Sequence, residues 1–388
     1  QVMLSGRRSQ GEACTAAWPV VHCPMRFALL AIVLAACDTG GDASPAADAG
    51  PADAAGPAGA FGSDAVLADA LVPDAFAPDA FVGPLDDTLR LDHLQARGTH
   101  NSYHLRPDTL FHPSHDYAQV PLDEQIERQG VRQLELDLHA RVEGGFDVLH
   151  LPLIDPNTTC LAFEDCLRTV ERWSDAHPGH LPILIWIEPK DEGSAPVNGH
   201  VRSVDRMDQL DAAILEVLPR ARLFTPDDLR RDHASVRDAV RADGWPNLAA
   251  VRGRIIFALL DRGDHRTSYI GEAADLADRL LFVNPDDTAD PRAAFLKIDD
   301  GGSEEARAAV AAGFLVTSNV DAADGTPEEN AAHRAAALAN GVHWLSSDHP
   351  APDGPDDADW LDIPGGNPAR CNPVTAPEAC TAAALEDL

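Results

Sequence analysis

From about residue 89 onward, the chain alternates short apolar runs with segments of helical periodicity. This alternation is typical of a parallel α/β fold, in which strands are followed by helices. The apolar runs predict strands at residues 94–99, 131–138, 146–151, 183–188, 254–260, 280–283 or 295–298, 314–318 and 342–347. Eight strands in a single domain predict a closed (β/α)8 barrel of the TIM type.

Two helix–strand units near the C-terminus show this pattern most clearly. In residues 326–329, TPEE supplies a capping residue, a proline at the first helical position and a glutamate at the third. The helix is expected to stop at Gly341, before the last strand. Residues 303–313 repeat the scheme ahead of the strand at 314–318. In a barrel of this kind, the chemistry is expected at the C-terminal ends of the strands.

The first 88 residues follow a different pattern. After Arg26, an apolar run of about ten residues is too short to span a bilayer and predicts an export signal. The run ends in Leu-Ala-Ala-Cys37, which resembles a bacterial lipobox whose cysteine is acylated; an ordinary signal peptide with a chance cysteine is the alternative. Residues 1–37 are interpreted as a leader with a lipoprotein-type signal peptide. Residues 38–88, rich in Ala, Pro, Gly and Asp, predict a disordered tether to a folded domain at 89–388.

Charge and cysteine content narrow the class of protein further. The chain has 30 Lys plus Arg against 63 Asp plus Glu, a formal net charge of −33, which argues against a nucleic-acid partner. An exported protein meets oxidants, so the four cysteines beyond the leader favour disulfides. Short loops favour Cys160 with Cys166 and Cys371 with Cys380, although four cysteines allow three connectivities. A zinc site built from all four thiolates is the alternative, but no CxxC spacing occurs.

Polar side chains stand at the ends of the first four predicted strands, where buried parallel strands are otherwise apolar. They are His100 with Asn101, Glu135 with Asp137, His150, and Glu188 followed by Lys190. Singly, these residues have ordinary interpretations as turn residues, a half-exposed strand, a core histidine and a surface ion pair. Together, amide and carboxylate oxygens suit a hard cation such as Ca²⁺, and histidines suit acid/base work. The set predicts metal-assisted cleavage of a phosphodiester.

Four stretches carry a family resemblance: GTHNSYH (98–104), QLELDLH (133–139), FDVLHLP (146–152) and ILIWIEPKD (183–191). In this order they resemble the phosphoinositide-specific phospholipase C superfamily, and more closely its bacterial calcium-dependent branch. The likeness covers nearly all of residues 89–365. It implies a Ca²⁺ cofactor and a phosphatidylinositol-like substrate, cleaved to diacylglycerol and a cyclic or open inositol phosphate.

The resemblance also implies roles for individual residues. His100 would contact the phosphate and His150 would protonate the leaving alkoxide. The calcium ligands would be Asn101, Glu135, Asp137 and Glu188, and one carboxylate of the Glu135–Asp137 pair could also take the proton of the attacking hydroxyl. Lys190 would face the phosphate. Tyr103 and His104 are interpreted either as substrate contacts or as loop packing, and Asp348 as closing the pocket or orienting a catalytic side chain.

One departure from the family changes which substrates the sequence leaves open. Members often carry arginines in a stretch resembling VRTRSDA, whereas residues 316–322 read VTSNVDA. Two alternatives therefore stay open: a phosphodiesterase for small glycerophosphodiesters, and a surface lipoprotein that keeps the barrel without turnover. For the favoured enzyme we expect a monomer, exported and either lipid-anchored at Cys37 to a bacterial membrane, facing the periplasm or cell surface, or secreted.

Overall fold

A computed structural model describes residues 81–191, 198–322, 325–352 and 359–386. The predicted signal peptide, Cys37 and the tether up to residue 80 lie outside the described residues. The last residues of the predicted tether belong to the folded domain, because Asp86 forms a buried ion pair with Arg252 at 2.7 Å. In the described ranges, no helix has both the length and the apolar character needed to cross a membrane.

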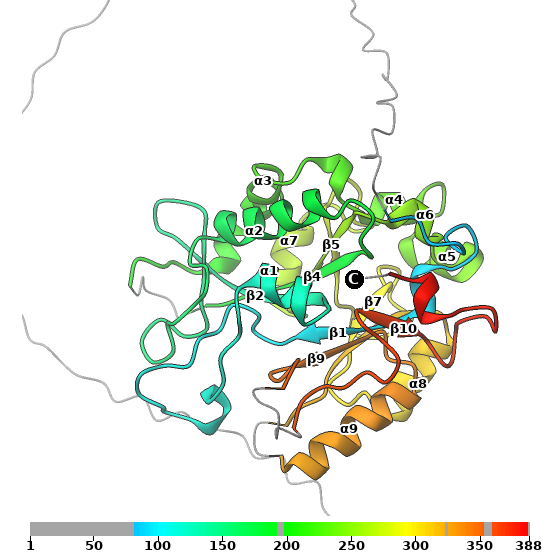
Figure 1. Ribbon diagram of the computed structural model, residues 1–388. Coiled ribbons are helices and arrows are strands. Elements are labelled where there is room, and N and C mark those ends of the chain that lie inside the picture. The colour runs from blue at the N-terminus through cyan, green and yellow to red at the C-terminus, as the bar shows by residue number, and fades with distance from the viewer. Residues whose placement is uncertain (1–80, 192–197, 323–324, 353–358, 387–388) are drawn as a thin grey trace, which may run out of the picture. The chain divides into compact units, whose positions relative to one another are not determined.

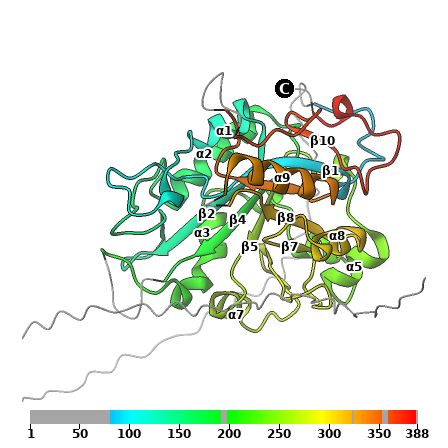
Figure 2. The ribbon, with the colours of Figure 1, turned by 90° about the horizontal axis from the view of Figure 1, so that it is seen from below.

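Eight parallel strands form a nearly closed barrel, as the sequence predicts (Figures 1 and 2). They follow the order β6-β5-β4-β2-β1-β9-β8-β7, and β3 and β10 add antiparallel pairings to β2 and β1. The strands are β1 (Leu94–Thr99), β2 (Val131–Ala140), β3 (Phe146–Val148), β4 (Ile183–Pro189), β5 (Ile255–Leu259), β6 (Leu281–Val283), β7 (Phe295–Lys297), β8 (Leu315–Asn319), β9 (Trp344–Ser347) and β10 (Ala369–Cys371).

Helices surround this barrel, with α2 and α3 on the side of β2 and β4, and α8 and α9 against β8 and β9 (Figure 1). The helices are α1 (Leu122–Arg128), α2 (Phe163–Ala176), α3 (Leu210–Leu215), α4 (Pro226–Arg230), α5 (Val236–Asp243), α6 (Leu248–Val251), α7 (Asp264–Ile270), α8 (Glu304–Ala311) and α9 (Pro327–Ala339). The Thr326 capping box is present, and Gly313 and Gly341 take positive φ after α8 and α9. Both predicted helix–strand units are thus confirmed.

The run at 146–151 is not a barrel strand, which corrects the prediction. Gly144 and Gly145 take positive φ and turn the chain back, so that β3 pairs antiparallel with the end of β2. The barrel still has eight strands, because residues 280–283 and 295–298, the alternatives predicted from the sequence, both contain strands, β6 and β7.

The barrel opens between β6 and β7, where side chains replace the strand ladder. The Asn284 side-chain oxygen accepts a hydrogen bond from the Lys297 backbone N–H at 3.1 Å. Arg262 donates to the Lys297 carbonyl at 2.6 Å and to the Asn284 side chain at 3.2 Å. These bonds satisfy backbone groups that an open sheet edge would leave without partners.

Alternation along the strands sorts apolar from polar side chains. On β2, Leu134, Leu136 and Leu138 pack outward with apolar residues of α1 and α2. Glu135 lies on the opposite face and reaches Lys297 of β7, a contact that crosses the barrel interior. The polar residues of β2 therefore point into the barrel, toward the ends of the other strands.

The C-terminal segment covers the barrel at the N-terminal ends of β1 and β2. β10 pairs with β1, and Glu386 forms a buried ion pair with Arg132 at the start of β2, at 2.6 Å. Disulfides join Cys160 to Cys166 and Cys371 to Cys380, the pairing that the short loops favour. The opposite end of the barrel, where the strands finish, holds the predicted site residues.

The buried imidazole of His343 should make stability depend on pH. Its Nδ1 accepts from the Val316 N–H and its Nε2 donates to the Asp92 carbonyl, and burial lowers its pKa to about 3. The unfolded chain takes up this proton near pH 6.5 while the folded protein does not, so stability is lost as the pH falls below 6.5. Between pH 7 and pH 5 this residue should lower the unfolding free energy by about 2 kcal/mol.

Urea unfolding at both pH values checks this expectation. His343→Gln keeps an acceptor and a donor but no titrating group, so the variant should lose less stability than the wild type over this interval. An equal pH dependence in the two proteins would contradict it.

Candidate active site

The register between β2 and β4 brings three carboxylates together. Asp137 pairs directly with Glu188, and Glu135 lies two residues earlier on the same inward face of β2. Ligand oxygens of Glu135, Asp137 and Glu188 all lie within 4.8 Å of one another. Glu135 and Asp137 are buried and Glu188 is partly exposed. Three of the four predicted calcium ligands therefore form one group at the C-terminal ends of neighbouring strands.

Asp137 is held in an electrostatically costly position. Neither of its carboxylate oxygens accepts a hydrogen bond of normal geometry from the described residues. The Lys190 ammonium lies 3.1 Å from Asp137 and 2.6 Å from Glu188, so Lys190 points toward these carboxylates. Burial and the charge of Glu188 nevertheless raise the pKa of Asp137 to about 8. A further cation beside Asp137 would lower that cost.

Glu135 has a cation of its own. Lys297 Nζ lies 2.7 Å from Glu135 Oε2, and both side chains are buried. Burial raises the pKa of Glu135, but the charge of Lys297 outweighs it and leaves the pKa below its usual value. Glu135 is therefore kept ionised, unlike Asp137.

The register between β1 and β9 places His100 beside Asp348. Thr99 pairs with Ser347, and in the next residues His100 Nδ1 lies 2.8 Å from Asp348 Oδ1. His100 Nε2 lies 3.7 Å from Glu135. Burial lowers the pKa of His100, but the charge and hydrogen bond of Asp348 outweigh it and raise the pKa to about 9. His100 is thus a cationic side chain next to the carboxylate group.

Asn101 turns the chain at the end of β1. Its φ of 40° lies in the left-handed region, which asparagine tolerates better than most residues. The Asn101 side chain accepts from the Tyr103 hydroxyl at 3.3 Å and donates to the Tyr117 hydroxyl at 3.2 Å. Tyr103 is fully buried, so here it positions Asn101 and does not reach the cavity.

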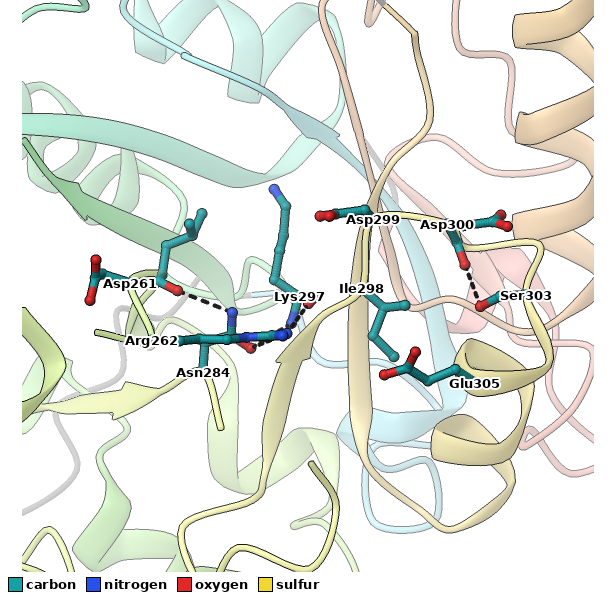
Figure 3. A pocket seen from close by; sticks show the side chains of 10 residues that line it. Asp261, Arg262, Asn284, Lys297, Ile298, Asp299, Asp300, Ser303 and Glu305 are labelled. Atoms are coloured by element: carbon teal, nitrogen blue, oxygen red, sulfur yellow. Dashed lines mark hydrogen bonds between the residues drawn. The ribbon is translucent and has the colours of Figure 1, made fainter. Parts of the chain in front are cut away.

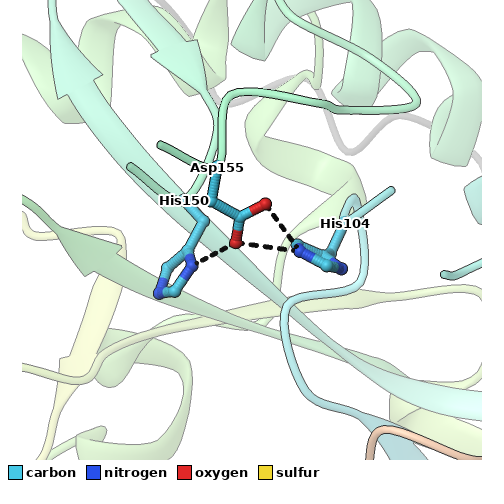
Figure 4. A group of neighbouring side chains, drawn as sticks. All are labelled: His104, His150 and Asp155. Atoms are coloured by element: carbon cyan, nitrogen blue, oxygen red, sulfur yellow. Dashed lines mark hydrogen bonds and ion pairs between the residues drawn. The ribbon is translucent and has the colours of Figure 1, made fainter. Parts of the chain in front are cut away.

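His150 follows β3 and is held by Asp155, which also holds His104 (Figure 4). His150 Nδ1 lies 2.7 Å from Asp155 Oδ2, and His104 Nε2 lies 2.9 Å from the same oxygen. Burial raises the pKa of Asp155, but the hydrogen bonds from the two histidines outweigh it and hold the pKa well below its usual range. This contact fixes the His150 ring and leaves its Nε2 for another partner.

A cavity of about 290 Å³ connects the two histidines. Its lining comes from the ends of β1, β8 and β9 and from the loops after β1 and β3: His100, Asn101, Ser114, His115, His150, Asn319, Asp321, Ser346 and Asp348. Of the predicted site residues, the structure brings His100, Asn101, His150 and Asp348 to its wall. The carboxylate group adjoins this wall through His100 and Glu135.

A second cavity, of about 490 Å³, lies at the opening between β6 and β7 (Figure 3). Arg262, Asn284 and Lys297 line it together with acidic residues that follow β5 and β7. Lys297 connects the two regions, because it lines this cavity and its ammonium binds Glu135.

Sequence reasoning missed Asp155, His115 and Lys297. Lys297 offered a signal, since a lysine in the buried apolar run FLKI needs a charged partner. Asp155 and His115 offered none, because Asp155 lies in an irregular loop and His115 in a single 3₁₀ turn (Pro113–His115), each among other polar residues.

The carboxylate group fits the calcium ion that the sequence implies. Its donors are hard oxygens, and Ca²⁺ binds about six to eight oxygen ligands of this kind. Asp137 is buried beside Glu188, and burial and the charge of Glu188 raise its pKa, so a cation bound here would offset both effects. Lys190 is partly exposed on a flexible stem, so its ammonium can move aside.

A parallel barrel with these carboxylates and two carboxylate-paired histidines at its strand ends has the site of a metal-assisted phosphodiesterase. Residues 142–373, more than half of the chain, match the family described as phosphoinositide phospholipase C, Ca²⁺-dependent. The chain belongs to this family, whose members are phosphodiesterases. The matched stretch includes His150, Glu188 and Asp348 and begins after Glu135 and Asp137.

Two solved structures of a calcium-dependent phosphoinositol-specific phospholipase C from a Gram-negative bacterium, Pseudomonas sp, are similar to this chain. An apo crystal form has a TM-score of 0.52 and the myoinositol complex one of 0.53, each at 19% identity. Each comparison covers 75% of this chain and 98% of the other. At this identity the likeness establishes the barrel fold. No curated protein matches the chain.

Proposed function

We propose that this protein is a calcium-dependent phospholipase C that cleaves phosphatidylinositol-like lipids into diacylglycerol and a cyclic inositol phosphate. The observation that carries the proposal is the meeting of a carboxylate group and two oriented histidines at one cavity. Neither feature alone would define a phosphodiesterase. Family membership supports the class of reaction, and the substrate is inferred from the cavity and its rim.

Each residue has a role that its contacts support. Calcium held by Asn101, Glu135, Asp137 and Glu188 would supply charge neutralisation at the phosphoryl oxygen and a more acidic hydroxyl. His100, cationic through Asp348, stabilises the negative charge that develops on the phosphate. A neighbouring ring hydroxyl attacks phosphorus, and Glu135, kept ionised by Lys297, accepts its proton. His150 gives its Nε2 proton to the diacylglycerol oxygen as the phosphorus–oxygen bond breaks.

The cavity favours a head group without extra phosphates. Among the described residues that line it there is no lysine or arginine, and Asp321 on the β8 side is already paired with Arg334. Asn319 Oδ1 and Ser346 Oγ are buried at this wall with no hydrogen-bond partner among the described residues. Such atoms suit the hydroxyls of a neutral polyol ring better than further phosphate groups.

Exposed apolar side chains on the loops beside the cavity support a lipid substrate. The loops after β1 and β3 adjoin through backbone hydrogen bonds between residues 103–105 and 157–159. Phe111, in the first loop, is 61% exposed, and Leu153, in the second, is 70% exposed. Such side chains can enter a lipid interface next to the site.

Replacing Phe111 and Leu153 by serine should reduce activity on lipid vesicles roughly tenfold or more, because each apolar side chain that enters the bilayer contributes about 1.5–3 kcal/mol. Activity on a short-chain substrate below its micelle concentration should stay unchanged. Val374→Ser is the matched control, since Val374 is also exposed but lies in the C-terminal segment after β10. Equal losses on both substrates would count against an interfacial role.

Phosphorus NMR tests the proposed function directly. The protein is incubated with phosphatidylinositol micelles, first with calcium and then with a chelator. A cyclic inositol phosphate signal that requires calcium is the expected result. A linear glycerophosphate released from small glycerophosphodiesters, with phosphatidylinositol left intact, would favour the alternative phosphodiesterase. No product from either substrate would favour a barrel that only binds.

A further inference from the structure

We propose that His104, His115, His150 and Asp155 form a second metal site, distinct from the carboxylate group, that takes a transition-metal dication such as Zn²⁺. Imidazole nitrogens and a single carboxylate are the donors that zinc prefers. Calcium takes oxygen donors, so the two sites select different ions by their chemistry.

The donor atoms of this group gather around one carboxylate oxygen. Three imidazole nitrogens surround Asp155 Oδ2: His150 Nδ1 at 2.7 Å, His104 Nε2 at 2.9 Å and His115 Nδ1 at 3.6 Å. Ligands about 2.0–2.1 Å from a tetrahedral zinc lie roughly 3.3 Å from one another. The ligand atoms of His104, His150 and Asp155 already lie within 4.8 Å of one another, and His115 would move toward them to complete the set around an ion.

His115 supplies an observation independent of the hydrogen bonds in Figure 4. The residue is only 8% exposed, and its Nδ1 has no hydrogen-bond partner among the described residues although it faces Asp155. A buried imidazole nitrogen without a partner is costly, and a metal ion would satisfy it. His115 and His150 also line the cavity, which provides the path by which an ion enters.

Binding at this site should block catalysis, and this consequence rests on the proposed function. Zinc would replace the proton on His150 Nδ1. The ring would then carry only its Nε2 proton, whose loss would leave an imidazolate, so it could no longer protonate a leaving alkoxide. Zinc would thus act as an inhibitor that excess calcium does not displace, because calcium is held elsewhere.

The test is a titration of the protein with zinc chloride in the presence of excess calcium, followed by calorimetry, and a second titration with Co²⁺ followed by visible absorption. We expect one zinc ion per chain and the intense absorption of tetrahedral Co²⁺. His115→Ala should weaken zinc binding at least tenfold. His333→Ala is the matched control, because His333 is exposed on α9 and lies outside the group; it should bind zinc as the wild type does.

Three results would overturn the proposal: no binding of zinc, equal zinc affinity in His115→Ala and the wild type, or displacement of zinc by calcium. None of these readouts depends on turnover. A protein that binds zinc as expected but cleaves no lipid would therefore contradict the proposed function and leave the metal site standing.

Discussion

Asp137→Asn is expected to abolish the stabilisation of this protein by calcium and to lower turnover by roughly a hundredfold or more, the scale on which a lost electrostatic contact acts in a transition state. Asp137 is fully buried, and its ligand oxygen lies within 4.8 Å of those of Glu135 and Glu188. An amide of the same shape keeps the packing but removes a charge that a dication requires.

Thermal unfolding separates this effect from misfolding. Without calcium, Asp137→Asn should be at least as stable as the wild type, because it replaces a buried acid whose pKa is raised to about 8. Calcium at a hundred times its dissociation constant should stabilise the wild type by about 2.7 kcal/mol and the variant by almost nothing. Asp147→Asn, which removes a carboxylate paired with Arg141 and His200, should keep the calcium effect. An unchanged calcium effect in Asp137→Asn would remove Asp137 from the metal site.

His150→Ala is expected to lower turnover by roughly 10²- to 10⁴-fold, the range of general acid catalysis. Calcium should stabilise this variant as it does the wild type. His150 binds Asp155 and is not one of the proposed calcium ligands. The pair of variants thus distinguishes a lost ligand from a lost proton donor.

A change of leaving group shows whether His150 acts as an acid. An inositol phosphate ester of p-nitrophenol releases a weakly basic phenolate that needs little protonation, so His150→Ala should lose far less activity on this ester than on the lipid. A similar loss on both substrates would mean that His150 only supports the structure of the cavity. Kinetics on the two substrates, with His333→Ala on the exposed face of α9 as a control, decide between these outcomes.

Asp155 takes part both in the proposed acid catalysis and in the proposed second metal site. Without a transition metal, it orients His150 through Nδ1 and so presents Nε2 to the cavity. With such an ion, the same oxygen becomes a ligand and His150 loses its acidic form. One carboxylate would therefore serve both the active and the inhibited protein, and zinc should reduce activity without changing the calcium dependence of stability.

Local sequence patterns were enough for the elements of the barrel. The bounds of β1 and β4 match their apolar runs to within a residue, and the Thr326 capping box and Gly341 set the ends of α9. These features depend on side-chain periodicity and on residues close in sequence. The same reasoning mistook the run at 146–151 for a barrel strand, because a hairpin arm and a short parallel strand have the same apolar pattern.

The sequence by itself determined the fold class, the family resemblance and the polar residues at the strand ends. Only the tertiary structure decided their partners: Lys297 for Glu135, Asp348 for His100 and Asp155 for both His104 and His150. Two of these contacts join residues more than 150 positions apart. They depend on strand register and on the closure of the barrel, which no local pattern encodes. The sequence therefore shows the charged residues of the site but not which of them form pairs.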